Sequence, residues 1–179
     1  MEQKKQVRIS VRALVEFVLR SGDIDNRRSG AAQKDAMAAG TRIHKKIQKR
    51  MGGNYRAEVP LKYTALDEEE DIELLVEGRA DGIFEEDGIV TIDEIKGVYM
   101  DLERLAEPVA VHMAQAMCYG YFYCCDRDLD GVRIQLTYCN LEPEEIRRFH
   151  EDRSNEELEV VVRSVSPEYF KWARYPCHH

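Results

Sequence analysis

The chain has 179 residues, of which 34% are charged and 44% hydrophobic, with a formal net charge of −8 at pH 7. This length predicts a single domain spanning residues 1–179, with a core large enough to fold without disulfide or metal staples. The acidic balance argues against a protein that coats nucleic acid, because affinity for phosphate comes from clustered Lys and Arg.

No apolar run reaches membrane-spanning length, and the polar N-terminus is unlike a signal peptide, so we expect a soluble cytoplasmic protein without a membrane partner. The cysteine residues are odd in number and scattered, which fits a reducing compartment better than a disulfide framework. They are Cys118, Cys124, Cys125, Cys139 and Cys177.

Two helices are predicted in the first third of the chain. Ser10 is a suitable N-cap for a helix over residues 11–20, a polar turn region follows at 22–30, and a second helix is expected over 31–51. His44 leans toward the packed side of that second helix, where a histidine is more often a core residue than a ligand. Basic residues surround it and form either a solvated face or a rim that contacts a nucleic-acid backbone. They are Arg42, Lys45, Lys46, Lys49, Arg50 and Arg56.

An antiparallel meander of three strands is predicted next, at about residues 57–65, 72–84 and 89–97. Asp87-Gly88 between two β-rich runs is a strong signal for a two-residue hairpin loop. Counting outward from that loop places Asp81 opposite Glu94, and cross-strand partners have Cβ atoms about 4.5–5.5 Å apart.

Lys96 shares a strand face with Glu94, so Asp81, Glu94 and Lys96 are expected to converge. Two adjacent carboxylates repel each other unless a cation neutralises them, and oxygen ligands of this kind suit Mg²⁺ or Mn²⁺. A lysine beside the metal can orient the attacking water. The alternative is an exposed salt-bridge ladder, but the apolar residues of the same face favour a site at the rim of a buried layer. These residues are Ile83, Val90 and Ile92.

A helix is predicted from Pro108, in its first turn, to about residue 125. His112, Gln115 and Tyr119 fall on one stripe of this helix. The stripe either faces the core or directs Gln115 and Tyr119 toward the metal site, with His112 expected at most to buttress it.

The C-terminal third is expected to hold strands at 131–139 and 145–150. Ser154 and Glu157 form a capping box for a helix through residue 162, and Ser166-Pro167 is expected to start a separate turn of helix. The predicted order is ααβββαββα, which fits an α/β fold with a central mixed sheet flanked by helices.

Four motifs, in this order and spacing, resemble those of the PD-(D/E)xK nuclease superfamily. They are His44, Gly78-Arg79-Ala80-Asp81, Asp93-Glu94-Ile95-Lys96 and Gln115-xxx-Tyr119. The RecB-like branch is the most similar, and within it the chain resembles nuclease domains that precede DinG-type helicases. The similarity covers about residues 8–175, so the chain is expected to be a nuclease domain, and the resemblance favours the N-terminal part of a longer helicase–nuclease.

The resemblance implies a restriction-endonuclease-like core and a Mg²⁺- or Mn²⁺-dependent deoxyribonuclease, expected to be an exonuclease acting on single strands or ends in repair or recombination. Its site residues would be His44, Asp81, Glu94 and the Ile95 carbonyl for the metal and Lys96 for the water, while Gln115 and Tyr119 would position the nucleic-acid strand or the catalytic groups. Relatives with an Fe–S cluster carry one cysteine before the His motif and three near the C-terminus, so no cluster is expected here.

A second hypothesis is a catalytically inactive nuclease-fold module that binds DNA or docks onto a helicase. The acidic total charge and the compact length motivate it. Sequence leaves open DNA versus RNA, cleavage polarity, exonuclease versus endonuclease mode, and the number of metal ions.

Overall fold

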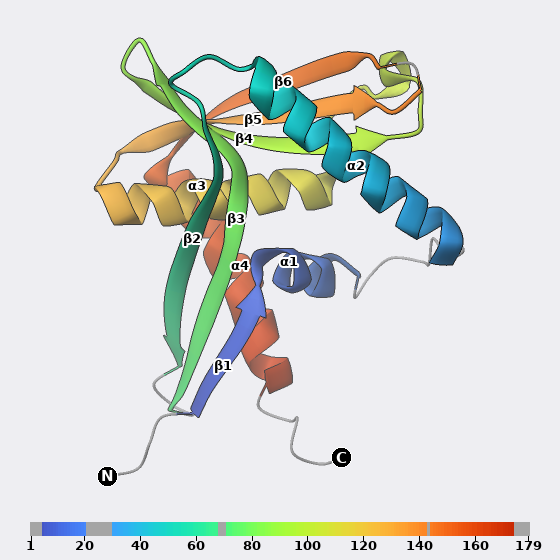
Figure 1. The fold of residues 1–179 in the computed structure, drawn as a ribbon. Helices are drawn as coiled ribbons and strands as arrows, with labels where there is room; N and C mark the ends of the chain where they lie inside the picture. The colour runs from blue at the N-terminus through green and yellow to red at the C-terminus, as the bar shows by residue number, and fades with distance from the viewer. Residues whose placement is uncertain (1–4, 21–29, 68–70, 143, 174–179) are drawn as a thin grey trace.

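The computed structural model describes residues 5–20, 30–67, 71–142 and 144–173, which form one six-stranded mixed sheet with helices on both faces (Figure 1). The strands are β1 (Lys5–Ser10), β2 (Arg56–Asp67), β3 (Ile72–Glu86), β4 (Ile89–Val98), β5 (Gly131–Asn140) and β6 (Ile146–Ser154). The helices are α1 (Val11–Arg20), α2 (Gly30–Arg50), the short 3-10 helix η1 (Leu102–Arg104), α3 (Ala110–Arg127) and α4 (Asn155–Ala173).

Strand β3 organises the sheet because three other strands pair with it. β2 runs antiparallel along one edge of β3, over residues 72–83. On the other edge, β1 pairs in parallel with residues 72–77, and β4 pairs antiparallel with residues 82–86. Residues 78–81 of β3 therefore have no partner on this second edge among the described strands, and we call this stretch the fork.

The hairpin register is the one that the sequence predicts. Glu86 pairs with Ile89 and Gly82 pairs with Asp93, so the next position along places Asp81 opposite Glu94. Both loop residues have positive φ, 54° at Asp87 and 78° at Gly88, as a type I′ hairpin turn requires.

The two faces of the sheet are covered unequally. Helices α1, α3 and α4 pack on one face and enclose the main hydrophobic core. Helix α2 crosses the opposite face over β4 (Figure 1). There it contributes to a smaller cluster formed by Ile43, Ile47, Ile95 and Cys139. These aliphatic residues of α2 fix which side of the helix meets the sheet.

Most predicted elements are present, and both predicted caps form. Ser10 Oγ accepts the N–H of Ala13 at 3.0 Å. Ser154 Oγ accepts the N–H of Glu157 at 3.1 Å, and the Glu157 carboxylate accepts the N–H of Ser154 at 3.2 Å. The mixed α/β fold class is thus confirmed, and the architecture is consistent with a restriction-endonuclease-like core.

Several elements differ from the prediction, either in their presence or in where they begin and end. Strand β1 was not expected, since its alternation of half-buried and exposed residues is short and mostly polar. Helix α4 continues past Pro167 without the predicted break, because its preceding turns are held by buried residues of the main core. Helix α3 begins at Ala110 with Val109 as its cap, so Pro108 precedes the helix.

The predicted turn region at 22–30 lies outside the described residues except for its last residue, which opens α2. Strand β6 extends to Ser154, beyond the predicted 145–150. Among the described residues, the helices are too short or too polar for any of them to cross a lipid bilayer.

Candidate functional site

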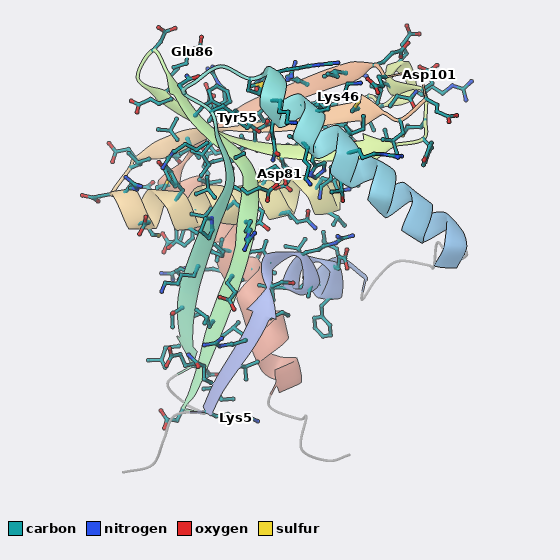
Figure 2. All side chains as sticks on the ribbon, in the orientation of Figure 1. Lys5, Lys46, Tyr55, Asp81, Glu86 and Asp101 are labelled. Atoms are coloured by element: carbon teal, nitrogen blue, oxygen red, sulfur yellow. The ribbon has the colours of Figure 1, made fainter. Side chains whose placement is uncertain are left out.

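Asp81 is the last residue of the fork and the centre of the site (Figure 2). Because β3 has separated from β4 at this point, the N–H of Ile95 has no strand partner on that side. Asp81 Oδ2 accepts this N–H at 2.7 Å. The other carboxylate oxygen, Oδ1, lies 3.4 Å from Nδ1 of His44, and the Asp81 backbone carbonyl accepts from Gln48 Nε2 at 2.9 Å.

Helix α2 supplies two of these contacts from one stripe. His44 and Gln48 are four residues apart and therefore lie on the same helix face. Each follows a buried isoleucine, Ile43 or Ile47, that packs on the sheet. The packing of the isoleucines therefore directs the imidazole and the amide toward Asp81.

Glu58 is a site residue that the sequence analysis missed. It lies at a gap in the β2–β3 ladder, between the pairs Ala57–Gly82 and Val59–Ala80, and has a φ of 54°. A glutamate in the left-handed region is uncommon, and here Gln48 Nε2 donates to its carboxylate at 3.0 Å. One potential ligand atom from each of His44, Glu58 and Asp81 lies within 4.8 Å of the others.

Glu94 lies beside Asp81, close enough for the charges of the two carboxyl groups to interact. Burial, and then the charge of Asp81, raise the pKa of Glu94 well above its usual value. Although burial alone raises it, the pKa of Asp81 is lowered by its hydrogen bond and charge interaction with His44. Of the two carboxyl groups, Glu94 is therefore the one whose protonated form the fold favours.

Lys96 completes the group on the same strand face as Glu94. Its Nζ lies 3.7 Å from Glu94 Oε1 and donates to Oε1 of the buried Gln115 at 3.0 Å. The structure therefore brings Asp81, Glu94 and Lys96 together, as the hairpin count predicts. Gln115, predicted to contact nucleic acid, positions the ammonium group.

Tyr119, the other residue predicted to contact nucleic acid, is buried beneath the fork. Its hydroxyl forms a hydrogen bond with the backbone of Arg79, and burial raises the pKa of this phenol. A Cβ at Gly78 would lie 2.7 Å from that hydroxyl. The first glycine of the Gly78-Arg79-Ala80-Asp81 motif thus makes room for the tyrosine.

His112 lies near Lys96, but its hydrogen bond is with a residue outside the candidate site. Its Nδ1 is 2.9 Å from the hydroxyl of Tyr138, which accepts the N–H of Val109 at 3.0 Å. Burial, and then the charges of Lys96 and Arg12, lower the pKa of His112 to about 4. A neutral His112 that accepts from Tyr138 is a buttress of α3.

Asp93 occupies the other face of β4 and is completely buried. It accepts hydrogen bonds from Tyr55 at 2.7 Å, from Thr137 at 2.7 Å and from Gln135 at 3.1 Å. A Cβ at its partner Gly82 would lie 1.8 Å from the Tyr55 ring. This network fixes β4 from behind and was not predicted.

The donor set at the fork fits a divalent cation. Its ligand atoms come from His44, Glu58 and Asp81, and beside them Glu94 Oε2 is buried without a hydrogen-bond partner among the described residues. Unpaired buried oxygens of this kind are rare in folded proteins, and a cation would satisfy this one and relieve the repulsion between Asp81 and Glu94. The group can hold a metal ion, and these contacts do not distinguish one divalent ion from another.

In comparisons with known proteins, no family model and no curated protein sequence matches this chain. Among solved structures, the chain is similar to the crystal structure of SSO0001, with a TM-score of 0.55 and 17% sequence identity. The match covers 92% of this chain and 77% of that one. At this identity the likeness supports the fold alone.

Sequence reasoning missed Gln48 and Glu58 for the same reason. Gln48 and Glu58 reach Asp81 from elements that a hairpin count does not include. Gln48 carries a signal that could have been read, since it follows His44 by one helical turn. Glu58 carries no such signal. Its carboxylate lies near Asp81 because the pairing of β2 with β3 is interrupted there, and tertiary structure sets that interruption.

Proposed function

We propose that this chain is a metal-dependent nuclease that hydrolyses phosphodiester bonds of DNA. The observation that carries the proposal is the adjacent pair of buried carboxyl groups, Asp81 and Glu94, at the fork, with His44 on one side and Lys96 on the other. The unpartnered Glu94 Oε2 supports it, because a site built only for stability would not leave a buried carboxylate oxygen unsatisfied.

Mg²⁺ or Mn²⁺ would be held by His44, Asp81, Glu94 and the Ile95 carbonyl, with Glu58 within reach. When bound, the ion supplies a Lewis acid for the phosphate and lowers the pKa of a water. In the hydrolysis, a water oxygen bonds to phosphorus, the bond from phosphorus to one ester oxygen breaks, and that oxygen takes up a proton.

Lys96 serves this reaction through its fixed ammonium group. Gln115 holds Nζ beside Glu94, where the group can donate a hydrogen bond to the attacking water and offset negative charge on the phosphate. Ile95 contributes through its backbone. Its N–H is held by Asp81, and the carbonyl of a strand residue points to the same side as its N–H.

The preferred substrate in this proposal is single-stranded DNA or DNA ends, cleaved in an exonuclease mode during repair or recombination. The motif pattern also leads us to propose a cytoplasmic protein that works with a fused or associated helicase. Substrates blocked at the 5′ or the 3′ end will establish polarity and mode.

The direct test is cleavage of labelled oligonucleotides by the native chain in Mg²⁺ or Mn²⁺. We expect Asp81→Asn, Glu94→Gln and Lys96→Gln each to abolish cleavage, while Glu86→Gln, an exposed change on the tip of the same hairpin, leaves it unchanged. Equal activity of the native chain and the Glu94→Gln variant would contradict the proposal.

A second candidate is a nuclease-fold module that binds DNA or docks onto a helicase without cutting. The net charge of −8 favours it, because a processive nuclease usually needs extensive cationic surface. Salt-dependent DNA binding with no cleavage in any divalent metal would select this candidate.

A further inference from the structure

The exposed side of helix α2 is strongly cationic in a chain that is acidic overall. Between Gly40 and Arg50 there is no acidic residue. Five basic residues are exposed on this segment, namely Arg42, Lys45, Lys46, Lys49 and Arg50. The same helix provides His44 and Gln48 to the fork, so this charge lies close to the candidate site.

The cations are not equivalent in their position around the helix. Successive residues are 100° apart, so Lys45 and Lys49 lie next to the stripe formed by His44 and Gln48. These two lysines are also one turn apart, about 6 Å along the axis at 1.5 Å per residue. Lys46 and Arg50 lie further round, on the edge of α2 that is opposite to the fork.

The two edges also differ in their partners. Lys46 forms an ion pair of 2.6 Å with Glu144, and Arg50 is close enough to the same carboxylate for their charges to interact. Figure 2 shows Lys46 on the opposite side of α2 from Asp81. Within the described parts of the chain, no carboxylate pairs with Lys45 or Lys49, and both side chains are exposed.

We propose that Lys45 and Lys49 bind consecutive phosphates of one nucleic-acid strand and guide it along α2 into the fork. The inference rests on the proposed nuclease function and deepens it by assigning the path of the strand. Lysine is a flexible point charge that contacts phosphate without reading bases, so the path is independent of sequence. Arg42 continues the same exposed stripe beyond the two lysines.

The test compares two double variants that remove equal charge from one helix. Lys45→Gln/Lys49→Gln changes the fork edge and Lys46→Gln/Arg50→Gln changes the opposite edge, each in a Glu94→Gln background to prevent cleavage. Fluorescence anisotropy with a labelled single-stranded oligonucleotide is measured over a range of salt concentrations. Losing two phosphate contacts should reduce the slope of log K against log salt by about 1.4 for the fork edge only.

Equal loss of slope in both double variants would overturn the inference, since the helix would then act only through diffuse charge. The inference would also be overturned if Lys45→Gln/Lys49→Gln kept the slope of its Glu94→Gln parent and, introduced into the active chain, kept the native KM for DNA cleavage. That result would leave the nuclease proposal standing. Selective loss of binding at the fork edge, in a native chain that never cleaves, would support the strand path and reject catalysis.

Discussion

Strand β4 carries two neighbouring buried carboxyl groups, on its opposite faces, in contrasting surroundings. Asp93 accepts three hydrogen bonds from uncharged donors. Glu94 faces a second carboxyl group and has an oxygen without any partner. The comparison shows how a structural acidic residue can be distinguished from a functional one within a single motif. The satisfied acid holds the strand in place, and the unsatisfied one is suited to bind something from outside.

The energetic contrast follows from the hydrogen bonds. Leaving a buried polar group unsatisfied costs about 1–3 kcal/mol, so Glu94 lowers the stability of the metal-free protein. Asp93 adds to stability because it satisfies three donors, of which Thr137 and Gln135 are buried. The following predictions test this difference.

The largest expected effect is that of Asp93→Ala. This change leaves the hydroxyl groups of Tyr55 and Thr137 without their acceptor and removes one of the two acceptors of Gln135 Nε2. We therefore expect a loss of about 3 kcal/mol or more in the free energy of unfolding. Urea denaturation measures it, with Glu86→Ala, an exposed position of the same hairpin, as the control. If Asp93→Ala lowers the free energy of unfolding no more than the control does, the structural role of Asp93 is contradicted.

The second largest effect is expected for Gly82→Ala, which disturbs the same network because the added methyl group displaces a neighbouring ring. The added Cβ would lie 1.8 Å from the Tyr55 ring, so the ring must move away from Asp93. We expect a destabilisation of about 1–3 kcal/mol, typical of overpacking. In a double-mutant cycle with Tyr55→Ala, the two losses should be clearly less than additive, and full additivity would contradict the contact.

Glu94→Gln should have the opposite sign. Replacing the strained carboxyl group removes its repulsion with Asp81, so we expect the metal-free protein to gain about 1 kcal/mol in stability. Native protein should be stabilised by Mn²⁺ through mass action, and the variant should lose this response. Thermal unfolding with and without Mn²⁺ measures both effects, and an unchanged Mn²⁺ response would exclude Glu94 as a ligand.

The smallest expected effect is on pH dependence. Because the pKa of Glu94 is raised in the folded state, the folded protein binds this proton more tightly than the unfolded chain. The stability that it contributes is full below the unfolded pKa of about 4.3 and is lost as pH rises through the folded pKa. The stability of native metal-free protein relative to Glu94→Gln should therefore fall with rising pH, as urea titrations will show.

Sequence alone predicts the part of the site that lies within one hairpin. Asp87-Gly88 sets the register, and the register sets Asp81 opposite Glu94, so local turn chemistry is sufficient. The positions of His44 and Gln48 depend on which side of α2 packs on the sheet, which the isoleucine spacing indicates.

The remainder depends on contacts between distant segments. Glu58 reaches the site only because the β2–β3 ladder is interrupted beside Asp81. The donors to Asp93 come from residues 38 to 44 positions away along the chain. The roles predicted for Gln115 and Tyr119 stay predictions as regards nucleic acid, while their observed contacts are with Lys96 and Arg79.

The two glycines that flank Asp81 have a further consequence for binding. Gly78 admits the hydroxyl of Tyr119 and Gly82 admits the ring of Tyr55, so aromatic side chains limit movement of the backbone from both faces of the sheet. The Asp81 carboxylate is therefore already held in one position once the protein has folded. An arriving ion would meet a preorganised ligand and lose little affinity to conformational entropy.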